Sequence, residues 1–192
     1  MLDREVDGVR DEALCVRIAV EVARLLHVRI SGDRHMRVQH NTTEASTAVF
    51  GFDHLAFGAV LVRDGAILTE ASNEVETRQD ATAHAEMQAI RAAGKGRTNG
   101  ELRNAVLYST LQPCGMCTMA SIWSKVGRVV YGAGRDDVHE MYFEAHHVDT
   151  LAFISKAYRD DVSITGGVLR EDCAELYYGP EEEVPKEQQG NV

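Results

Sequence analysis

Two short segments of the chain hold residue types that bind metals and transfer protons. The first is His84-Ala85-Glu86, and the second is Pro113-Cys114-Gly115-Met116-Cys117. The two cysteines are one helical turn apart, so both sulfurs can face one point, and a helix N-terminus favours the thiolate that binds metal. One imidazole and two thiolates make three protein ligands, which is typical of a catalytic Zn²⁺ with its fourth position left for water. We therefore predict that His84, Cys114 and Cys117 bind one zinc ion per subunit.

Glu86 is predicted to be the catalytic proton carrier. It is two residues from His84, too close to be a natural fourth ligand, yet within reach of a water on the zinc. A catalytic zinc lowers the pKa of its water to about 7, and a carboxylate beside it can take the proton and pass it on. The combination of H-x-E with P-C-x-x-C is the signature of zinc deaminases.

Two other interpretations of the cysteine pair stay open at this point. A C-x-x-C pair also occurs in thioredoxin-like redox dithiols. A structural zinc site would result if Cys15 or Cys173 supplied a fourth ligand. The matched His-x-Glu segment disfavours the redox interpretation, and nothing in the spacing directs the isolated cysteines toward the pair.

The elements that must position these residues are predicted to alternate between helix and strand. Hydrophobic periodicity and turn residues predict the following elements: a helix over 11–29, a hairpin over 57–72 around Arg63-Asp64-Gly65, a helix over 82–93 with Thr82 as N-cap, a strand over 105–110, a helix over 114–125 opened by Pro113, a strand over 128–133, and helices over 148–158 and 170–178 around a strand at 162–168. Such alternation indicates an α/β fold with helices on both faces of a sheet.

Length and composition favour one folded domain. The chain has 192 residues, and we expect a single domain over 1–179 with an irregular insertion at 30–54 and a flexible acidic tail at 180–192. It holds no apolar run of 18 residues, and its start lacks the apolar segment of an export signal, so we expect a cytoplasmic protein without a membrane partner. The net charge of −10 disfavours a nucleic acid partner, although residues 24–40 carry a local net charge of +3.

The motifs resemble those of the cytidine deaminase-like superfamily over about residues 55–178. Residues 80–86 are similar to its D-P-T-A-H-A-E motif, with Ala81 in place of Pro, and residues 109–114 are similar to its T-x-E-P-C motif, with Gln112 in place of Glu. The closer likeness is to the bacterial branch of guanine, cytosine and tRNA adenosine deaminases. This resemblance implies a three-layer α/β/α sandwich with a mixed five-stranded sheet, a homodimer with one Zn²⁺ per subunit, and hydrolysis of an aromatic C–NH₂ group to C=O with release of ammonia.

The resemblance also implies residues that bind the substrate. Asn73 stands eleven residues before His84, where the family has a substrate-binding Asn, although as a residue alone it fits a turn that closes the hairpin. The segment Ile122-Trp123-Ser124 resembles the corresponding segment of the guanine deaminase branch, although Trp123 fits an ordinary core aromatic equally well. The remaining candidates are the backbone N–H of Ala85 and the side chains of His139, Tyr142 and Glu144, which follow the strand at 128–133.

The expected function is zinc-dependent hydrolytic deamination of a free nucleobase, or of a related amino-heterocycle or nucleoside, with a guanine-like or cytosine-like ring. One alternative is deamination of tRNA adenosine to inosine by the same centre. Another is a non-catalytic zinc-stabilised binding module, which leaves Glu86 without a purpose. The acidic composition, Trp123 and the acidic residues at 136–144 together favour a small neutral ring over tRNA.

Overall fold

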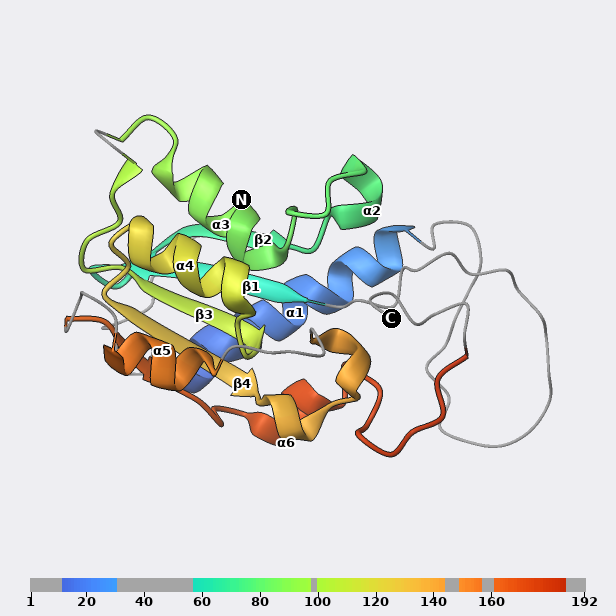
Figure 1. Cartoon of the computed structure of the whole chain (residues 1–192). Helices are drawn as coiled ribbons and strands as arrows, with labels where there is room; N and C mark the ends of the chain where they lie inside the picture. The colour runs from blue at the N-terminus through green and yellow to red at the C-terminus, as the bar shows by residue number, and fades with distance from the viewer. Residues whose placement is uncertain (1–11, 31–56, 98–99, 144–148, 157–160, 186–192) are drawn as a thin grey trace.

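A five-stranded sheet forms the centre of the protein, with strand order β2-β1-β3-β4-β5 (Figure 1). The computed structural model describes residues 12–30, 57–97, 100–143, 149–156 and 161–185. In the described part of the chain, the α-helices and strands are α1 (Glu12–Ile30), β1 (Gly58–Arg63), β2 (Ala66–Ser72), α2 (Val75–Arg78), α3 (Ala85–Gly94), β3 (Val106–Leu111), α4 (Gly115–Trp123), β4 (Arg128–Ala133), α5 (Thr150–Lys156), β5 (Ser163–Thr165) and α6 (Arg170–Ala174). Two short 3-10 helices, Arg135–Asp137 and Glu140–Tyr142, follow β4.

The first two strands form the hairpin that the sequence predicts. Asp64 and Gly65 at its tip have φ of 53° and 79°, which is the left-handed pair required by a tight two-residue turn. β1 pairs antiparallel with both β2 and β3, whereas β3, β4 and β5 run parallel. The sheet is therefore mixed, as expected. The start of β1, the end of β2 and the ends of β3, β4 and β5 all lie at one edge of the sheet.

Helices cover both faces of the sheet, which confirms the predicted three-layer sandwich. Side chains of β1 alternate between the faces: Val60 and Val62 pack in a core with α1 and α6, and Ala59 and Leu61 pack in a second core with α3. A smaller core joins α4 to α5 on the α3 side. α6 approaches β4 closely, because a Cβ on Gly132 would lie 2.2 Å from the Sγ of Cys173. Figure 1 shows α3 and α4 side by side and α1 behind the sheet.

Several boundaries differ from the sequence prediction: the helix predicted over 170–178 ends at Ala174, and two other differences have a visible physical reason. Thr82 is not the N-cap of the third helix, since α3 begins at Ala85 and His84 occupies the cap position. The hydroxyl of Thr82 donates instead to the carboxylate of Asp80, so a local turn competes with the helix start. β5 ends at Thr165, short of the predicted residue 168. A Cβ on Gly166 would lie 2.3 Å from the ring of Tyr131, so the next position admits only glycine.

The two segments expected to be irregular are described only in part. Residues 31–54 of the predicted insertion, and with them most of the basic stretch, lie outside the described residues. The predicted tail is described as far as residue 185, and Val184 within it is only 5% exposed and packs in the same core as α1. None of the described helices is both long and apolar enough to cross a bilayer. The cytoplasmic location stays a prediction.

Candidate metal and catalytic site

Three predicted ligands converge at the sheet edge where α3 and α4 begin. The Nδ1 atom of His84 lies 3.7 Å from the Sγ of Cys114 and 3.7 Å from the Sγ of Cys117. A tetrahedral zinc with usual bond lengths would hold such nitrogen and sulfur atoms about 3.6 Å apart. Among the described residues, these three form the metal-ligating group, with all ligand atoms within 4.8 Å of one another. The spacing and the donor types fit Zn²⁺.

The structure disfavours a closed structural zinc site. Cys15 and Cys173 are buried in the core between the sheet and the layer of α1 and α6, apart from the group of three ligands. Three protein ligands leave one tetrahedral position for a non-protein ligand, which is the arrangement of a catalytic zinc.

Local backbone geometry explains why the ligands meet. His84 and Cys114 are both N-cap residues with extended backbone, at φ −62° and ψ 154° and at φ −66° and ψ 174°. Both caps lie where the chain crosses the same sheet edge before entering a helix. Cys117 follows within the first turn of α4, where the helix dipole favours negative charge.

Glu86 lies beside the ligands without joining the group. It is 6% exposed, its Oε1 accepts a hydrogen bond from the Ser109 hydroxyl at 3.1 Å, and its Oε2 lies 3.6 Å from the Sγ of Cys117. Burial raises the pKa of Glu86, and the negative charge of Cys114 raises it further. A carboxylate with a raised proton affinity suits a group that takes up a proton and gives it away.

The two cysteines differ in proton affinity. The hydrogen bond from the Cys117 thiol is the largest influence on Cys114 and lowers its pKa to about 4. The same bond is the largest of the influences that raise the pKa of Cys117, followed by burial. Without metal, this hydrogen bond favours negative charge on Cys114 over Cys117. Zinc binding displaces thiol protons because zinc is held by thiolates.

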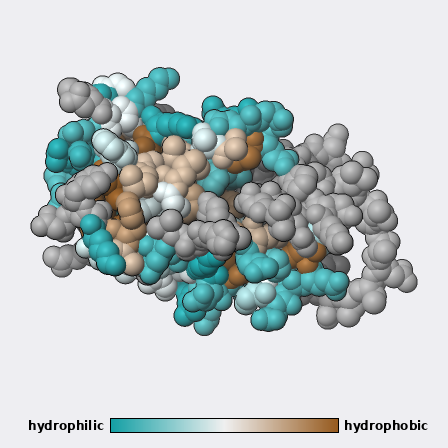
Figure 2. All heavy atoms as spheres, viewed as in Figure 1, coloured by the Kyte–Doolittle hydropathy of each residue, from teal (hydrophilic) through white to brown (hydrophobic). Residues whose placement is uncertain are grey.

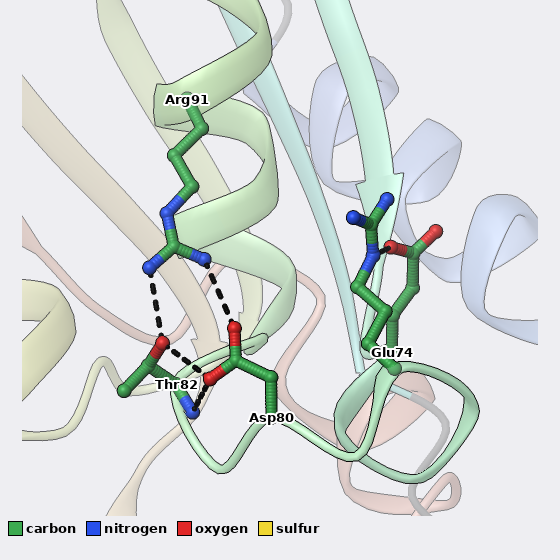
Figure 3. A network of polar contacts seen from close by, with 5 residues as sticks. Glu74, Asp80, Thr82 and Arg91 are labelled. Carbon is green, nitrogen blue, oxygen red and sulfur yellow. Dashed lines mark hydrogen bonds and ion pairs between the residues drawn. The ribbon is translucent and has the colours of Figure 1, made fainter.

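A polar turn precedes His84, and Arg91 of α3 bonds this turn to the helix (Figure 3). Asp80 Oδ1 accepts hydrogen bonds from the Thr82 amide at 2.8 Å and from the Thr82 hydroxyl at 2.7 Å. Arg91, two turns along α3, donates from Nη2 to the Thr82 hydroxyl at 3.0 Å and lies 3.8 Å from Asp80 Oδ2. We name Asp80, Thr82 and Arg91 the Asp80 clamp. The bonds from Thr82 are the largest of the influences that lower the pKa of Asp80.

The Asn73 and Ala85 candidates lie next to this turn. Asn73 is half-buried and follows directly after β2, and its amide donates to the Phe57 carbonyl at 3.1 Å. The adjacent Glu74 amide donates to the Ala83 carbonyl at 2.9 Å, which places Asn73 beside the residues that lead into α3. Ala85 is buried as the first residue of that helix, where backbone N–H groups have no partner within the helix.

His139 and Tyr142 are brought to the same edge and hold the C-terminal segment. The Nδ1 of His139 accepts from the Met141 amide at 3.1 Å, and the His139 amide donates to the Tyr178 carbonyl at 2.7 Å. The Tyr142 hydroxyl accepts from the Tyr178 amide at 3.1 Å. Tyr142 also packs edge-on against Phe57 and Tyr177, with ring centroids 5.9 and 5.3 Å apart. Glu144 lies outside the described residues.

Trp123 is placed differently from the other candidates. It is 67% exposed at the last residue of α4, so the core-aromatic interpretation is wrong. It stands six residues beyond Cys117, a rise of about 9 Å along the helix. Within one chain, Trp123 therefore lies at the opposite end of α4 from the ligands.

Several residues that shape the site are not identified by the sequence motifs. Ser109 lies in the segment that resembles the T-x-E-P-C motif but has no role assigned there, yet its hydroxyl donates to Glu86. Arg91, which bonds Thr82, has no motif of its own. Tyr177 lies in a predicted helix, but its hydroxyl is 2.6 Å from the Thr110 hydroxyl beside the site. A serine inside an otherwise apolar, buried strand is the signal that the sequence offers for this group.

Comparison with known proteins identifies the family. Residues 32–133, just over half of the chain, match the cytidine and deoxycytidylate deaminase zinc-binding region, and the chain belongs to this family. The guanine deaminase of Bacillus subtilis is 44% identical over 88 residues, which cover 46% of this chain and 56% of that protein. A tRNA-specific adenosine deaminase of Buchnera aphidicola is 38% identical over 119 residues, which cover 62% of this chain and 70% of that protein.

Solved structures of both kinds share the fold. One structure, from studies of A-to-I editing by tRNA:A34 deaminases, is 25% identical and has a TM-score of 0.61 over 85% of this chain and 99% of its own. A guanine deaminase from Nitrosomonas europaea is 19% identical, with a TM-score of 0.62 over 90% of this chain and 84% of its own. The fold of a zinc-binding deaminase is therefore shown, and relatives with two kinds of substrate share it.

Proposed function

We propose that the protein is a zinc-dependent hydrolase that deaminates a free nucleobase, or a related amino-heterocycle or nucleoside, and releases ammonia. The observation that carries this proposal is the place of Glu86. Its carboxylate is buried against the three-ligand group, 3.6 Å from Cys117 Sγ, while the group itself needs no fourth protein ligand. A structural zinc site has no use for such a carboxylate.

The residues divide the work as follows. His84, Cys114 and Cys117 would hold zinc, which supplies Lewis acidity that activates water at neutral pH. Glu86 takes a proton from the attacking water and passes protons to a ring nitrogen and to the leaving amine, so that C–NH₂ and H₂O become C=O and NH₃. The Ser109 hydroxyl, bonded to Glu86 Oε1, keeps the other carboxylate oxygen directed at the metal group.

Asn73 is our candidate for reading the substrate. Its amide side chain offers a donor and an acceptor, which suits the edge of a heterocycle. Its neighbour Glu74 donates a backbone hydrogen bond to Ala83, the residue before His84, so Asn73 lies close to that ligand. His139 and Tyr142 would act mainly by shaping the wall of the site, because their polar atoms already bond Met141 and Tyr178.

A small neutral ring is favoured as the substrate. The net charge of −10 opposes the approach of a polyanion. The guanine deaminase relative, whose name gives a small ring as its substrate, is 44% identical to this chain over 88 residues. The specific observation in favour of tRNA adenosine is the match to a tRNA-specific adenosine deaminase over 62% of the chain. The basic stretch at 24–40 would be its contact.

Ammonia release from a panel of amino-purines, amino-pyrimidines, amino-triazines and their nucleosides tests the reaction. Glu86→Gln keeps the shape of the side chain and removes the proton carrier, so kcat should fall about 100-fold or more with zinc content unchanged. The matched control is Glu70→Gln on the exposed face of β2, which should keep its activity. Full activity of Glu86→Gln would show that the mechanism is wrong.

Two measurements separate the rivals. A salt-sensitive complex with tRNA, together with inosine formation in it, would favour tRNA as the substrate, and no gel shift at low salt would exclude it. If zinc removal unfolds the protein and no amine in the panel or in tRNA is consumed, the protein is a zinc-stabilised binding module.

We also infer a homodimer, formed through the outer face of α4. This helix contains no charged residue, and Met116 and Trp123, seven residues apart, form an uncharged stripe on its outer face, where Trp123 is 67% exposed. Met119 and Ala120 between them are partly buried and pack against the cores below. Figure 2 shows hydrophobic side chains gathered over this part of the surface. A second copy of the chain is the partner that fits, because an uncharged, flat stripe pairs with itself without charge repulsion even at a net charge of −10.

Light scattering coupled to size-exclusion chromatography measures this directly. The wild type should elute as a dimer, and Trp123→Glu should shift it to a monomer because a buried, unpaired charge opposes the contact. Lys125→Glu, just past the same helix, changes charge outside the stripe and serves as the control. A wild-type monomer at micromolar concentration would contradict the inference.

A further inference from the structure

Gln112, one of the residues where this chain departs from the family motifs, joins three segments around the metal edge. We propose that Gln112 is a positioning residue that fixes residues 134–143, here named the substrate segment, against the turn that carries Cys114. This proposal deepens the proposed function: its KM measurement rests on that function, whereas its amide-exchange measurement does not. The segment contains His139 and Tyr142, so its placement sets the shape of the site.

The side-chain amide of Gln112 uses both its donor and its acceptor. Its Nε2 donates to the Thr150 hydroxyl at 3.0 Å, and its Oε1 accepts from the Arg135 amide at 3.3 Å. Thr150 is the first residue of α5 and is 1% exposed, so the donor bond ends in a buried group. One side chain thus links the Cys114 turn to the start of α5 and to the start of the substrate segment.

The contact with Arg135 reaches the far end of the substrate segment. The guanidinium of Arg135 lies over the ring of Phe143, 5.0 Å from its centroid. Beside Arg135, the Gly134 amide donates to Asp137 Oδ2 at 2.7 Å and closes a turn around it. A shift of the Arg135 backbone would therefore move both ends of the segment together.

The surroundings of Gln112 favour an amide over a carboxylate. A Cβ on Gly134 would lie 3.4 Å from Asp137 Oδ2 and 3.9 Å from Gln112 Oε1, so both oxygens lie close around the same glycine. Asp137 already has its cationic partner in Arg170. A second carboxylate at position 112 would add like-charge repulsion here and would remove the N–H that Thr150 accepts.

The Cys114 turn itself does not depend on the amide. The Gln112 backbone amide donates to the Ala133 carbonyl at 2.9 Å, and the Thr118 hydroxyl donates to the Pro113 carbonyl at 3.3 Å. Both bonds survive any substitution of the Gln112 side chain. We therefore expect the zinc affinity to hold when the placement of the substrate segment is loosened.

The experiment compares Gln112→Leu, Gln112→Glu and Thr150→Val in the full-length protein. Amide hydrogen exchange at Arg135, read residue by residue, should accelerate about 5- to 10-fold in Gln112→Leu, which removes the acceptor. It should change less in Thr150→Val, which removes only the partner of the donor. Zinc content should stay at one per subunit, and KM for the best substrate of the panel should rise about 5-fold while kcat changes less than about 2-fold.

Gln112→Glu separates the amide from its shape, and Gln79→Glu is its matched control. Gln79 is exposed and its amide donates only within its own turn, to the Glu76 carbonyl at 2.9 Å. Gln112→Glu should raise KM and Gln79→Glu should leave it unchanged. Unchanged Arg135 exchange in Gln112→Leu, or equal KM values for the two Gln→Glu variants, would overturn the proposal. The exchange readout needs no substrate, so failure of the proposed function would be seen separately as a panel without turnover.

Discussion

The two turns that deliver the metal ligands are held by different kinds of force. The turn before His84 is fixed by the Asp80 clamp, whose ionic pair is in contact with solvent: the side chains of Asp80 and Arg91 are 42% and 47% exposed. The turn before Cys114 is joined to its neighbours by the neutral amide of Gln112, whose partner Thr150 is buried. Both turns open a helix at the same sheet edge.

The metal site therefore has two sides with different supports: the His84 side, supported by the Asp80 clamp, and the Gln112 side, where the turn before Cys114 meets the substrate segment. An exposed ion pair is weakened by salt and contributes little stability by itself, whereas a buried neutral hydrogen bond is insensitive to salt and costly to leave unmade. We therefore expect the turn before His84 to loosen in high salt, whereas the contacts of the Gln112 side chain, which place the substrate segment, should be insensitive to salt. The predictions below test whether the two sides respond separately.

The largest effect should come from removing a metal ligand, because zinc is then lost whichever of the two sides the ligand belongs to. His84→Ala and Cys114→Ala should each weaken zinc binding more than about 100-fold, beyond the 10–100-fold typical of residues that only support ligands. Competition with a chelator and metal analysis measure this. Cys15→Ala, a buried cysteine outside the ligand group, should keep its zinc while losing stability. Zinc loss in that control would instead assign Cys15 to the site.

A smaller effect should follow from opening the clamp alone. Arg91→Met keeps the length of the side chain and removes both contacts to Asp80 and Thr82, so zinc should dissociate about 10-fold faster. Stopped-flow zinc release to a coloured chelator gives the rate. Arg103→Met removes another exposed ion pair, with Glu101, and should release zinc at the wild-type rate. Equal rates in the two variants would mean that the clamp does not hold His84.

Salt should separate the two sides without any mutation. Raising NaCl from about 0.05 M to about 1 M shortens the screening length to about 3 Å. Zinc release from the wild type should speed up about 2- to 3-fold toward the rate of Arg91→Met. Exchange of the Arg135 amide, which reports the Gln112 side, should stay constant. If the two readouts change together, the sides are mechanically one unit.

The smallest effect is expected from acid, acting on Asp80. Its pKa is lowered in the folded protein, chiefly by the hydrogen bonds from Thr82, so its stabilisation is present above the ordinary value of 3.8 and is lost as pH falls through the lower folded-state pKa. Denaturant unfolding of zinc-free wild type and Asp80→Asn at several pH values measures it. The two curves should differ at pH 6 and approach each other as the pH falls below the ordinary value of 3.8. A constant difference would exclude Asp80 as the titrating group.

The three central strands, β1, β3 and β4, were predictable because they are buried on both faces. Such strands read as short apolar runs, and the run over 128–133 has the same bounds in β4. The hairpin turn was predictable because Asp64-Gly65 supplies the left-handed pair. The start of α3 was not predictable from Thr82, since a residue that caps helices well also closes turns well, and here Thr82 closes the turn that Asp80 begins.

The ligands were predictable, and most of their supports were not. Two helix starts at one sheet edge bring His84 and Cys114 together by topology alone. Their supports are contacts across the fold: Ser109 meets Glu86 over 23 residues of sequence, and Gln112 meets Thr150 over 38. No local rule relates positions so far apart. The exposure of Trp123 was not predictable either, because helical spacing alone does not distinguish the core face of α4 from its outer face.

The core between the sheet and α1 has a consequence for how the protein is made. It joins Val16 of α1 to Tyr177 and Val184, which leave the ribosome more than 150 residues later. Domains complete their folding as units, so α1 must wait with its apolar face uncovered until nearly all of the described chain has emerged. The period of synthesis, rather than the finished state, is when this protein is most exposed to chaperones and to aggregation.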